Sequence, residues 1–572
     1  MDNQKNLLIA VVLSVVILVG FDFFFKPEKK QLQESSVEQN QIDQNVDSDK
    51  DENIPSINSQ IENVQVDKNK ILEERISFNS KRLSGTINLI GATLDDLSLK
   101  DYFESISKEK KINILNPVSS VSPYFLRIGW ASPDKSVKLP NKNSKWKSVK
   151  KNYNENEKIQ LEWNNNEGLT FYRTIEFDEN FMISVIDKVQ NESPKTIKLT
   201  NFSYLRRLNY RPENKFFILH EGPLGVFNDT LKEVSYDEIE ENNEIIETTK
   251  NGWIGYTDHY WQVTIFPETN ETFKARFKNL KDRRNSIQID FINENIKTLK
   301  SGDSLKTKSY IFAGAKEVPL IDQYIKKIGI NKLDLSVDFG WFYFLTKPLF
   351  YALHFLSSLV GNFGVGIIIL TICIRIVLFP LANKSFKSMN SMRMITPEIQ
   401  RIRERYKDDR QRMNQEMFAM YKEKKINPAA GCLPILIQIP IFFALYKVLF
   451  VSIEMRHAPF FGWIKDLSAP DPTSLFNLFG LVPWDTPAFL TIGISPILMG
   501  ITMFLQQKIN PPPPDPIQAK IFMMLPFIFT FLLATFPSGM VVYWTINNIL
   551  SIAQQYILLR KQSKMNITQG HE

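Results

Sequence analysis

The most constraining feature of this sequence is a series of long apolar runs separated by polar segments. About 20 apolar residues in a helix cross the roughly 30 Å of a bilayer's hydrocarbon core. Where such a run meets lipid, the backbone has to satisfy its hydrogen bonds internally, which a helix does. The runs therefore predict six membrane-spanning helices, at about residues 7–25, 361–381, 434–452, 488–507, 520–536 and 539–559.

One of these runs holds a charged residue, Arg375, between Thr371 and Pro380. An arginine at the centre of a membrane helix costs about 2.5–3.5 kcal/mol on insertion scales, so it should face protein or trapped water. Thr371 lies one helical turn earlier and faces the same way. The competing interpretation is that Arg375, close to Pro380, is a helix-end residue that extends to the membrane interface. Arg375 alone leaves these two interpretations about equal.

Composition divides the chain into two unlike parts. The mean hydropathy of −0.19 averages a mostly polar stretch, residues 27–340, with the apolar runs of the second part. The two cysteines, Cys373 and Cys432, lie in or beside apolar runs, so the polar part carries no disulfide framework. Its two histidines, His220 and His259, have no metal-ligand spacing around them, and no P-loop pattern occurs. We therefore expect no metal, no cofactor, no catalytic residue and no enzyme activity.

The first part of the chain predicts three successive domains. An uncleaved signal anchor comes first, at residues 1–26, because Phe23–Lys26 offers no small-residue cleavage site. Residues 27–70 are rich in Gln, Asn, Ser, Asp and Glu, which predicts a disordered tether. Residues 71–318 contain short alternating apolar and polar runs with frequent turn signals. This pattern is typical of a large antiparallel β-sandwich.

The second part predicts a membrane core with one large cytoplasmic connection. Residues 319–360 combine aromatic and basic residues, which predicts a linker followed by an interfacial amphipathic helix. The core follows at residues 361–560, with a short tail at 561–572. The connection 383–427 carries twelve basic and six acidic residues, so the positive-inside rule places it in the cytoplasm. Six spans then leave both termini in the cytoplasm and export the β-sandwich.

The cytoplasmic connection predicts a helical hairpin. Thr396-Pro397-Glu398 is a typical helix start, and Asp409 caps a second helix that runs to about Lys424. Methionines on one face of that helix either accept apolar partners or pack the hairpin itself. The basic face suits ribosomal RNA or anionic headgroups. The candidate recruitment residues are Arg401, Arg405, Met413, Met417 and Met420.

Polar residues recur inside the other apolar runs. Gln438 lies in the third span and Asn547 in the sixth. Singly, such residues are ordinary hydrogen-bonding links between membrane helices. Together with Arg375 and Thr371 they indicate a water-accessible cavity lined from several helices. We therefore predict a polar groove that contains Arg375, Thr371, Gln438 and Asn547.

Three further segments match a known family in order and spacing. They are Asn427–Tyr446 (NPAAGCLPILIQIPIFFALY), Ala458–Phe460 (APF) and Phe536–Gly539 (FPSG). With the Arg375 span, they make the chain resemble the YidC family of bacterial inner-membrane protein insertases, part of the Oxa/Alb/YidC superfamily. The resemblance covers nearly the whole chain. It implies an anchor helix, a periplasmic β-supersandwich and a five-helix insertase core in a multi-pass protein of the bacterial cell inner membrane.

The resemblance also implies a non-enzymatic mechanism. The arginine groove, open to the cytoplasm, receives the hydrophilic part of an incoming protein while its apolar segment slides along the third and fifth spans. Trp544 stands where the family usually has tyrosine, which keeps the aromatic surface but removes a hydroxyl. The implied contact residues are Tyr543, Trp544, Met523, Met524 and Pro440. The implied partners are nascent membrane proteins, the Sec translocon (SecYEG and SecDF), the ribosome and anionic lipids, with no DNA.

Two other function classes remain as alternatives. A small-solute transporter would show paired spans with inverted-repeat character, which this sequence lacks. A membrane-anchored periplasmic carbohydrate-binding protein would use an aromatic platform, for which the segment Gly252–Trp261 is a candidate. Core packing is the alternative role of that segment.

Overall fold

The computed structural model describes residues 74–208, 219–268, 271–281, 286–424, 433–478, 482, 487, 491–510 and 516–569. These residues form two compact units. One is the β unit, which ends at Trp341 and includes the short segment Val451–Glu454; the other is the helical unit, made of Phe342–Phe450 and the chain from Met455 onward. The expected anchor and tether, residues 1–26 and 27–70, lie outside the described residues.

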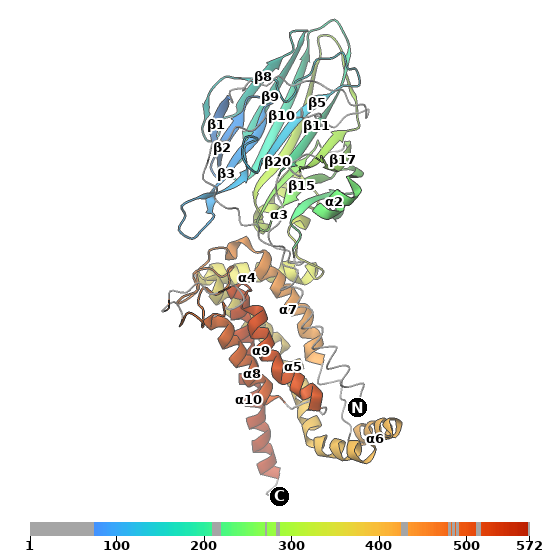
Figure 1. Cartoon of the computed structure of the whole chain (residues 1–572), viewed down its shortest axis with the longest axis vertical. Coiled ribbons are helices and arrows are strands. Elements are labelled where there is room, and N and C mark those ends of the chain that lie inside the picture. Colours follow the sequence, from blue (N-terminus) through green and yellow to red (C-terminus); the bar gives the residue numbers. More distant parts are fainter. Residues whose placement is uncertain are drawn as a thin grey trace, which may run out of the picture. The chain divides into compact units, whose positions relative to one another are not determined.

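The β unit consists of two sheets in which almost all neighbouring strands are antiparallel (Figure 1). Along the eleven-stranded sheet the order is β14 (Glu244–Lys250), β17 (Thr272–Asn279), β18 (Ile287–Asn293), β11 (Ile197–Arg207), β5 (Tyr124–Ala131), β3 (Thr93–Phe103), β2 (Leu83–Asn88), β1 (Arg75–Asn79) and β7 (Asn152–Tyr153), with β19 (Lys297–Leu299) beside β11 and β4 (Lys111–Leu115) beside β3. The β1–β7 pair is parallel.

The second sheet has nine strands within the described residues. Its order is β13 (Thr230–Glu233), β12 (Gly222–Phe227), β15 (Trp253–Thr257), β16 (Trp261–Phe266), β20 (Ser304–Ala315), β10 (Met182–Asn191), β9 (Leu169–Phe177), β8 (Ile159–Asn164) and β6 (Lys147–Ser148). The expected β-rich architecture of this part of the chain is confirmed by the two sheets.

Aromatic rings join the inner faces of the two sheets. Phe78 of β1 stacks on Phe177 of β9 with ring centroids 4.4 Å apart, and Tyr124 of β5 meets Tyr256 of β15 edge-on at 5.7 Å. Trp253 and Tyr256 are each only 1% exposed. Burial at these two positions favours core packing over a sugar platform for the segment Gly252–Trp261.

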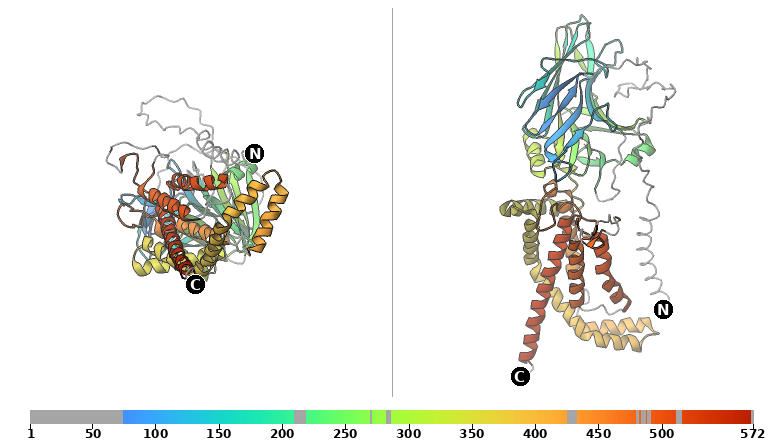
Figure 2. Two further views of the ribbon diagram at one scale, coloured as in Figure 1. Left: turned by 90° about the horizontal axis from the view of Figure 1, so that it is seen from below. Right: turned by 60° about the vertical axis from the view of Figure 1, so that its left-hand side comes forward.

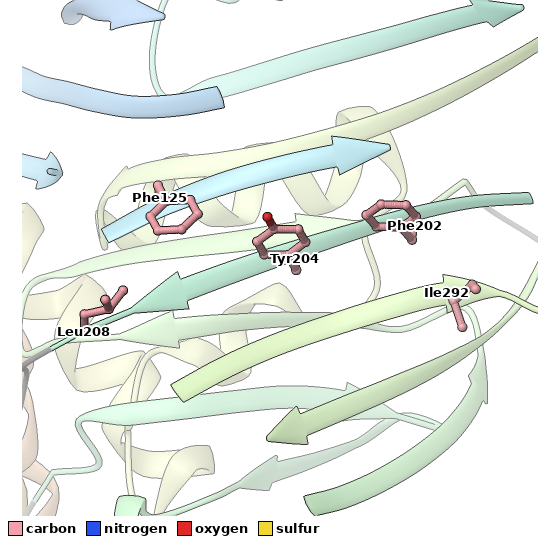
Figure 3. Packing of buried hydrophobic residues seen from close by; sticks show 5 residues of the cluster. All are labelled: Phe125, Phe202, Tyr204, Leu208 and Ile292. Carbon is pink, nitrogen blue, oxygen red and sulfur yellow. The ribbon is translucent and has the colours of Figure 1, made fainter. Parts of the chain in front are cut away.

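A second apolar cluster lies on β5, β11 and β18 of the larger sheet (Figure 3). Figure 3 shows Tyr204 between Phe125 and Phe202, with ring centroids 6.2 and 6.4 Å away respectively. Strand β18 is buried at every position, including the polar ones. Asp290 is held there by Arg276, whose Nη2 donates to its Oδ2 at 3.0 Å. The alternation read in the sequence therefore does not separate a buried face from a solvated one at this strand.

Short helices complete the β unit. Helix α3 (Val318–Ile328) ends at Gly329, which adopts the left-handed conformation with φ 78°. Helix α2 (Tyr236–Asn242) begins at Ser235, whose side chain accepts a hydrogen bond from the Glu238 backbone N–H. Two 3-10 turns follow in the chain, η1 (Leu333–Ser336) and η3 (Ile453–Met455).

The helical unit contains seven α-helices among the described residues. They are α4 (Tyr343–Val360), α5 (Phe363–Arg405), α6 (Arg410–Glu423), α7 (Leu433–Val451), α8 (Ile494–Ile509), α9 (Pro516–Leu533) and α10 (Ser538–Gln569). One stretch, Phe363–Ser388 of α5, is long and apolar enough to cross a membrane, while Ile437–Val451 and Ala519–Leu533 are shorter apolar stretches. The number of six spans accordingly stays a prediction.

Helix α5 corrects one expectation about the hairpin. It continues without interruption through Thr396–Glu398, so the helix start predicted there is wrong. Thr396 Oγ1 donates to the Met392 carbonyl at 3.1 Å instead of capping a new helix. The physical reason is packing: Ile395 and Ile399 are buried against α6, and tertiary contacts outweigh a local start signal.

The rest of the hairpin follows the expected pattern. Asp409 accepts a hydrogen bond from the Arg412 backbone N–H at 3.0 Å and so caps α6. Figure 2 shows the C-terminal part of α5 and helix α6 lying side by side. Helix α10 is longer than the predicted span and continues to Gln569, so most of the expected tail is helical. Helix α8 begins at Ile494.

Helix α4 has two unlike faces. Thr346, Phe350, Leu353 and Ser357 recur at helical spacing and are buried. Phe344, Phe355 and Leu359 are between 64% and 75% exposed. Aromatic and aliphatic residues exposed along one helix face suit the boundary between lipid and water.

Candidate functional site

Arg375 is held inside the helical unit by side chains of α10. Its Nε and Nη2 donate to Asn547 Oδ1 at 2.9 and 2.7 Å, and Nη2 also donates to Ser551 Oγ at 2.6 Å. Asn547 and Ser551 are one helical turn apart, so both point to the same side of α10. All these acceptors are uncharged, so the positive charge of Arg375 is oriented without being neutralised.

A cavity of about 600 Å³ surrounds the guanidinium. Its wall comes from α5, α7, α8, α9 and α10, and Arg375 is its one charged residue within the described part of the chain. Seven side-chain amides line it: Gln438, Gln506, Gln507, Asn510, Asn547, Gln554 and Gln555. Arg375 therefore faces a cavity whose wall combines side-chain amides with a larger apolar area, and this supports the groove interpretation of Arg375 over the interfacial one.

Aromatic rings form the apolar side of the cavity. Trp544 contacts Phe442 of α7 at a centroid distance of 4.9 Å and Phe529 of α9 at 5.5 Å. Tyr543 is buried, and its hydroxyl lies 3.4 Å from Gln438 Nε2. Rings from three helices, α7, α9 and α10, thus meet in the wall of the cavity that contains Arg375.

Three groove residues of the sequence analysis, Arg375, Gln438 and Asn547, line the cavity together with Tyr543 and Trp544. Thr371 does not line it, because it is 2% exposed and its Oγ1 donates to the Ile367 carbonyl at 2.7 Å. Met523 and Met524 are 48% and 61% exposed on α9, outside the cavity lining, and Pro440 also lies outside it.

The sequence analysis did not identify the C-terminal part of the α10 face that lines the cavity. Four residues that follow Asn547 along α10 also line the cavity: Ser551, Gln554, Gln555 and Leu558. Their spacing could have revealed them, because they lie four, seven, eight and eleven residues after Asn547. Residues with this spacing share one face of a helix. Gln555 Nε2 also donates at 2.7 Å to Oδ1 of Asn510, the residue that caps the C-terminus of α8, and this bond joins the two helices at this end.

The carboxylate of Asp471 fixes the start of α8, the helix that carries two of the lining amides and is followed by a third, Asn510. Its Oδ2 accepts from the Ser495 backbone N–H at 2.8 Å and from Ser495 Oγ at 2.5 Å. Its Oδ1 accepts from Thr473 Oγ1 at 2.6 Å, and Trp463 Nε1 donates to Oδ2 at 3.1 Å. Burial opposes ionisation of this group, but the hydrogen bonds from Ser495 and Thr473 outweigh it and lower the pKa of Asp471.

The hairpin of α5 and α6 forms a second, separate groove of about 320 Å³. Arg401 and Arg405 line it together with three acidic residues, Glu398, Glu416 and Glu423. Met420 is 7% exposed and packs with Ile395 and Ile399, and Met417 covers this cluster. Met413 is half-buried. Met417 and Met420 therefore pack the hairpin.

The fold and the cavity define a class: a protein with a large β unit and a helical unit, which contains a membrane-length apolar stretch and an arginine-containing cavity between helices. Within the described residues, no group of three or more His, Cys, Asp or Glu side chains could hold a metal ion.

Two family models match the chain. Residues 75–352 match the YidC periplasmic domain, and residues 355–565 match the 60Kd inner membrane protein family. The Membrane protein insertase YidC of Pelagibacter ubique (strain HTCC1062) is 43% identical over 566 residues, covering 98% of this chain and 99% of that protein. The protein of the same name from Rickettsia massiliae (strain Mtu5) is 44% identical over 562 residues, covering 97% and 99%.

The chain belongs to the YidC family of membrane protein insertases, and it is therefore an insertase and not an enzyme. Among solved structures, an active YidC insertase with its first transmembrane domain resolved matches at a TM-score of 0.36 and 18% identity, covering 85% of this chain and 92% of that one. A galactose mutarotase-like protein from Lactobacillus casei matches at 0.29 and 11%, covering 42% and 99%. The family assignment rests on the sequence comparisons.

Proposed function

We propose that this insertase uses the Arg375 cavity to receive the polar part of an incoming membrane protein. The observation that carries the proposal is the bonding of Arg375: uncharged acceptors on α10 hold its guanidinium in place beside an amide-lined cavity. A fixed charge among polar groups lowers the cost of removing a short polar segment from water. The charge attracts acidic residues of the substrate most strongly.

The apolar part of the substrate supplies the driving force. Its transfer to lipid yields about 25 cal/mol per Å² of apolar surface removed from water. The exposed side chains of α9, Met523 and Met524 among them, provide the surface along which this part moves. Trp544 lines the cavity and contacts Phe529 of α9, so it joins that surface to the cavity, with Tyr543 next to it in the lining. Thr371 and Pro440 do not line the cavity and stay candidate positions of the groove and of the contact surface.

The proposed topology is that of a multi-pass protein of the bacterial inner membrane. Both termini and the hairpin lie in the cytoplasm, and the β unit lies in the periplasm. The basic residues of the hairpin connection support this orientation through the positive-inside rule.

The proposed partners beyond nascent membrane proteins are the Sec translocon, the ribosome and anionic lipids. Arg401 and Arg405 are candidate contacts for polyanions, although acidic residues share their groove and weaken its positive potential. Phe418 and Met394, each 70% exposed on the hairpin, offer an apolar contact for a protein partner.

Site-specific photocrosslinking of stalled nascent chains tests the proposal. A photoreactive amino acid at Gln438 or Trp544 should crosslink to a nascent membrane protein. The same probe at Tyr556, which is 62% exposed on α10 and outside the cavity lining, serves as the matched control. Crosslinks from Tyr556 but not from Gln438 or Trp544 would contradict a substrate path through the cavity.

A further inference from the structure

Side-chain amides line the part of the cavity between the C-terminal end of α8 and the later turns of α10. The chemistry of this part differs from that around Arg375. Gln506, Gln507, Asn510, Gln554 and Gln555 form this surface, which we call the amide mouth. A carboxamide carries both a donor and an acceptor, as a peptide unit does, whereas a guanidinium only donates. The mouth therefore matches a backbone better than it matches any one type of side chain.

Two atoms of the amide mouth lack partners within the described residues. Gln554 Nε2 and Gln555 Oε1 are both buried without a hydrogen bond from the protein. One is a donor and the other an acceptor, on adjacent residues of the same helix. Buried polar atoms normally have partners, so these two side chains keep an unmet N–H donor and an unmet oxygen acceptor at the cavity wall. Both atoms are shielded in this structure, so each must turn toward the cavity to meet an entering segment.

The length of the lined surface suits a short extended peptide. The α10 face from Asn547 to Leu558 rises about 16 Å at 1.5 Å per residue. An extended chain covers that length with about five residues, at roughly 3.3 Å each. Such a peptide has no internal hydrogen bonds, so each of its backbone groups needs a partner where water is scarce.

We propose that the amide mouth binds the main chain of the entering polar segment, in an extended conformation and without regard to its side chains. This inference rests on the proposed function and divides the recognition of the substrate into two parts. Arg375 discriminates by charge, whereas the amide mouth accepts any sequence that is unfolded. The substrate class is therefore an extended, unstructured polypeptide segment.

The test measures insertion of single-span substrates into phosphatidylethanolamine and phosphatidylglycerol vesicles that contain the full-length protein. The substrates share one apolar span and differ in the entering segment, which is acidic, neutral, or neutral with backbone esters in place of amides. An ester removes the N–H donor while leaving the side chains unchanged. The protein variants are Gln554→Met with Gln555→Met, and the matched control is Tyr556→Leu, outside the lining.

The double variant should insert acidic and neutral segments about ten- to a hundredfold more slowly, to the same extent, since each of the two lost hydrogen bonds weakens binding about three- to tenfold. The ester segment should be slow with the unaltered protein and should lose less further rate with the double variant than the amide segment does, because the ester has already removed the N–H that Gln555 Oε1 would accept. The control should insert all substrates at the unaltered rate.

A selective loss for acidic segments, or an ester effect equal in the variant and the unaltered protein, would overturn main-chain recognition. If the double variant does not fold, the ester substrate still decides: equal rates for ester and amide segments with the unaltered protein overturn the proposal. Failure of the unaltered protein to insert any substrate above empty vesicles would instead contradict the proposed function.

Discussion

Arg375 Nη2 donates to Asn547 Oδ1 at 2.7 Å, across from α5 to α10. The bond orients a cation with an uncharged group, which leaves its electric field available to a substrate. An aspartate at this position would hold the guanidinium as well but would cancel its charge. Asn547 thus fixes the position of the Arg375 guanidinium without reducing its positive charge.

Replacing Asn547 with aspartate should preserve folding and impair insertion. Asn547→Asp places a carboxylate within ion-pair distance of Arg375, and the pair neutralises the cavity. Insertion of acidic segments should fall about tenfold, equivalent to about 1.4 kcal/mol, with little loss for neutral ones. The insertion rates of both substrates into vesicles measure the effect on insertion, and the melting temperature of the variant measures the effect on folding. Equal slowing of both substrates would count against a charge effect.

Close packing of α8 on α9 depends on Gly500. A Cβ added at this position would collide with Thr530 Oγ1, which itself donates to the Pro526 carbonyl at 2.8 Å. Gly500→Ala should destabilise the helical unit by about 1–3 kcal/mol, the usual cost of overpacking. Adding Thr530→Ala removes the colliding atom and should restore most of the loss in a thermal-unfolding series. No rescue by the second substitution would show that the collision is not the cause.

Asp471 should make the start of α8 sensitive to acid. Its folded-state pKa lies below the ordinary value of 3.8, so its ionised form contributes stability above that pH, and the contribution is lost as the pH falls toward the folded pKa. Asp471→Asn should remove this dependence, because the amide cannot ionise. Unfolding of the full chain in detergent, followed between about pH 5 and pH 2, measures the difference. Identical acid dependence in the variant would contradict the role of Asp471.

Local patterns in the sequence predict much of this fold, and distant pairings account for the rest. The apolar–polar alternation of residues 71–318 correctly predicts β-structure at β18, where Ile287, Ile289 and Phe291 are the apolar positions. It does not predict that Asp290 is buried, because the burial depends on Arg276, which comes from a different strand. In the same way, Thr396–Glu398 has a helix-start pattern, yet the contacts of Ile395 and Ile399 with Met420 keep α5 continuous.

The candidate site likewise contains residues that the sequence alone reveals and residues that only the folded structure reveals. Arg375, Gln438 and Asn547 are recognisable because a polar residue stands out within an apolar run. Gln554 and Gln555 lie near the end of the predicted span, where polar residues are ordinary and do not stand out. Their spacing puts them on the same helix face as Asn547, but only the structure shows that this face lines the cavity with amides from the end of α8.

The charge of Arg375 is the central claim, and insertion of substrates with acidic entering segments by charge-altered variants tests it most directly. Arg375→Glu should block insertion of acidic segments in reconstituted vesicles, while Arg375→Lys should retain most of it. A substrate with lysines in place of the acidic residues should regain insertion with Arg375→Glu, because the attraction is restored with both signs reversed. Equal insertion of the acidic segment by the unaltered protein and by Arg375→Glu would contradict the account.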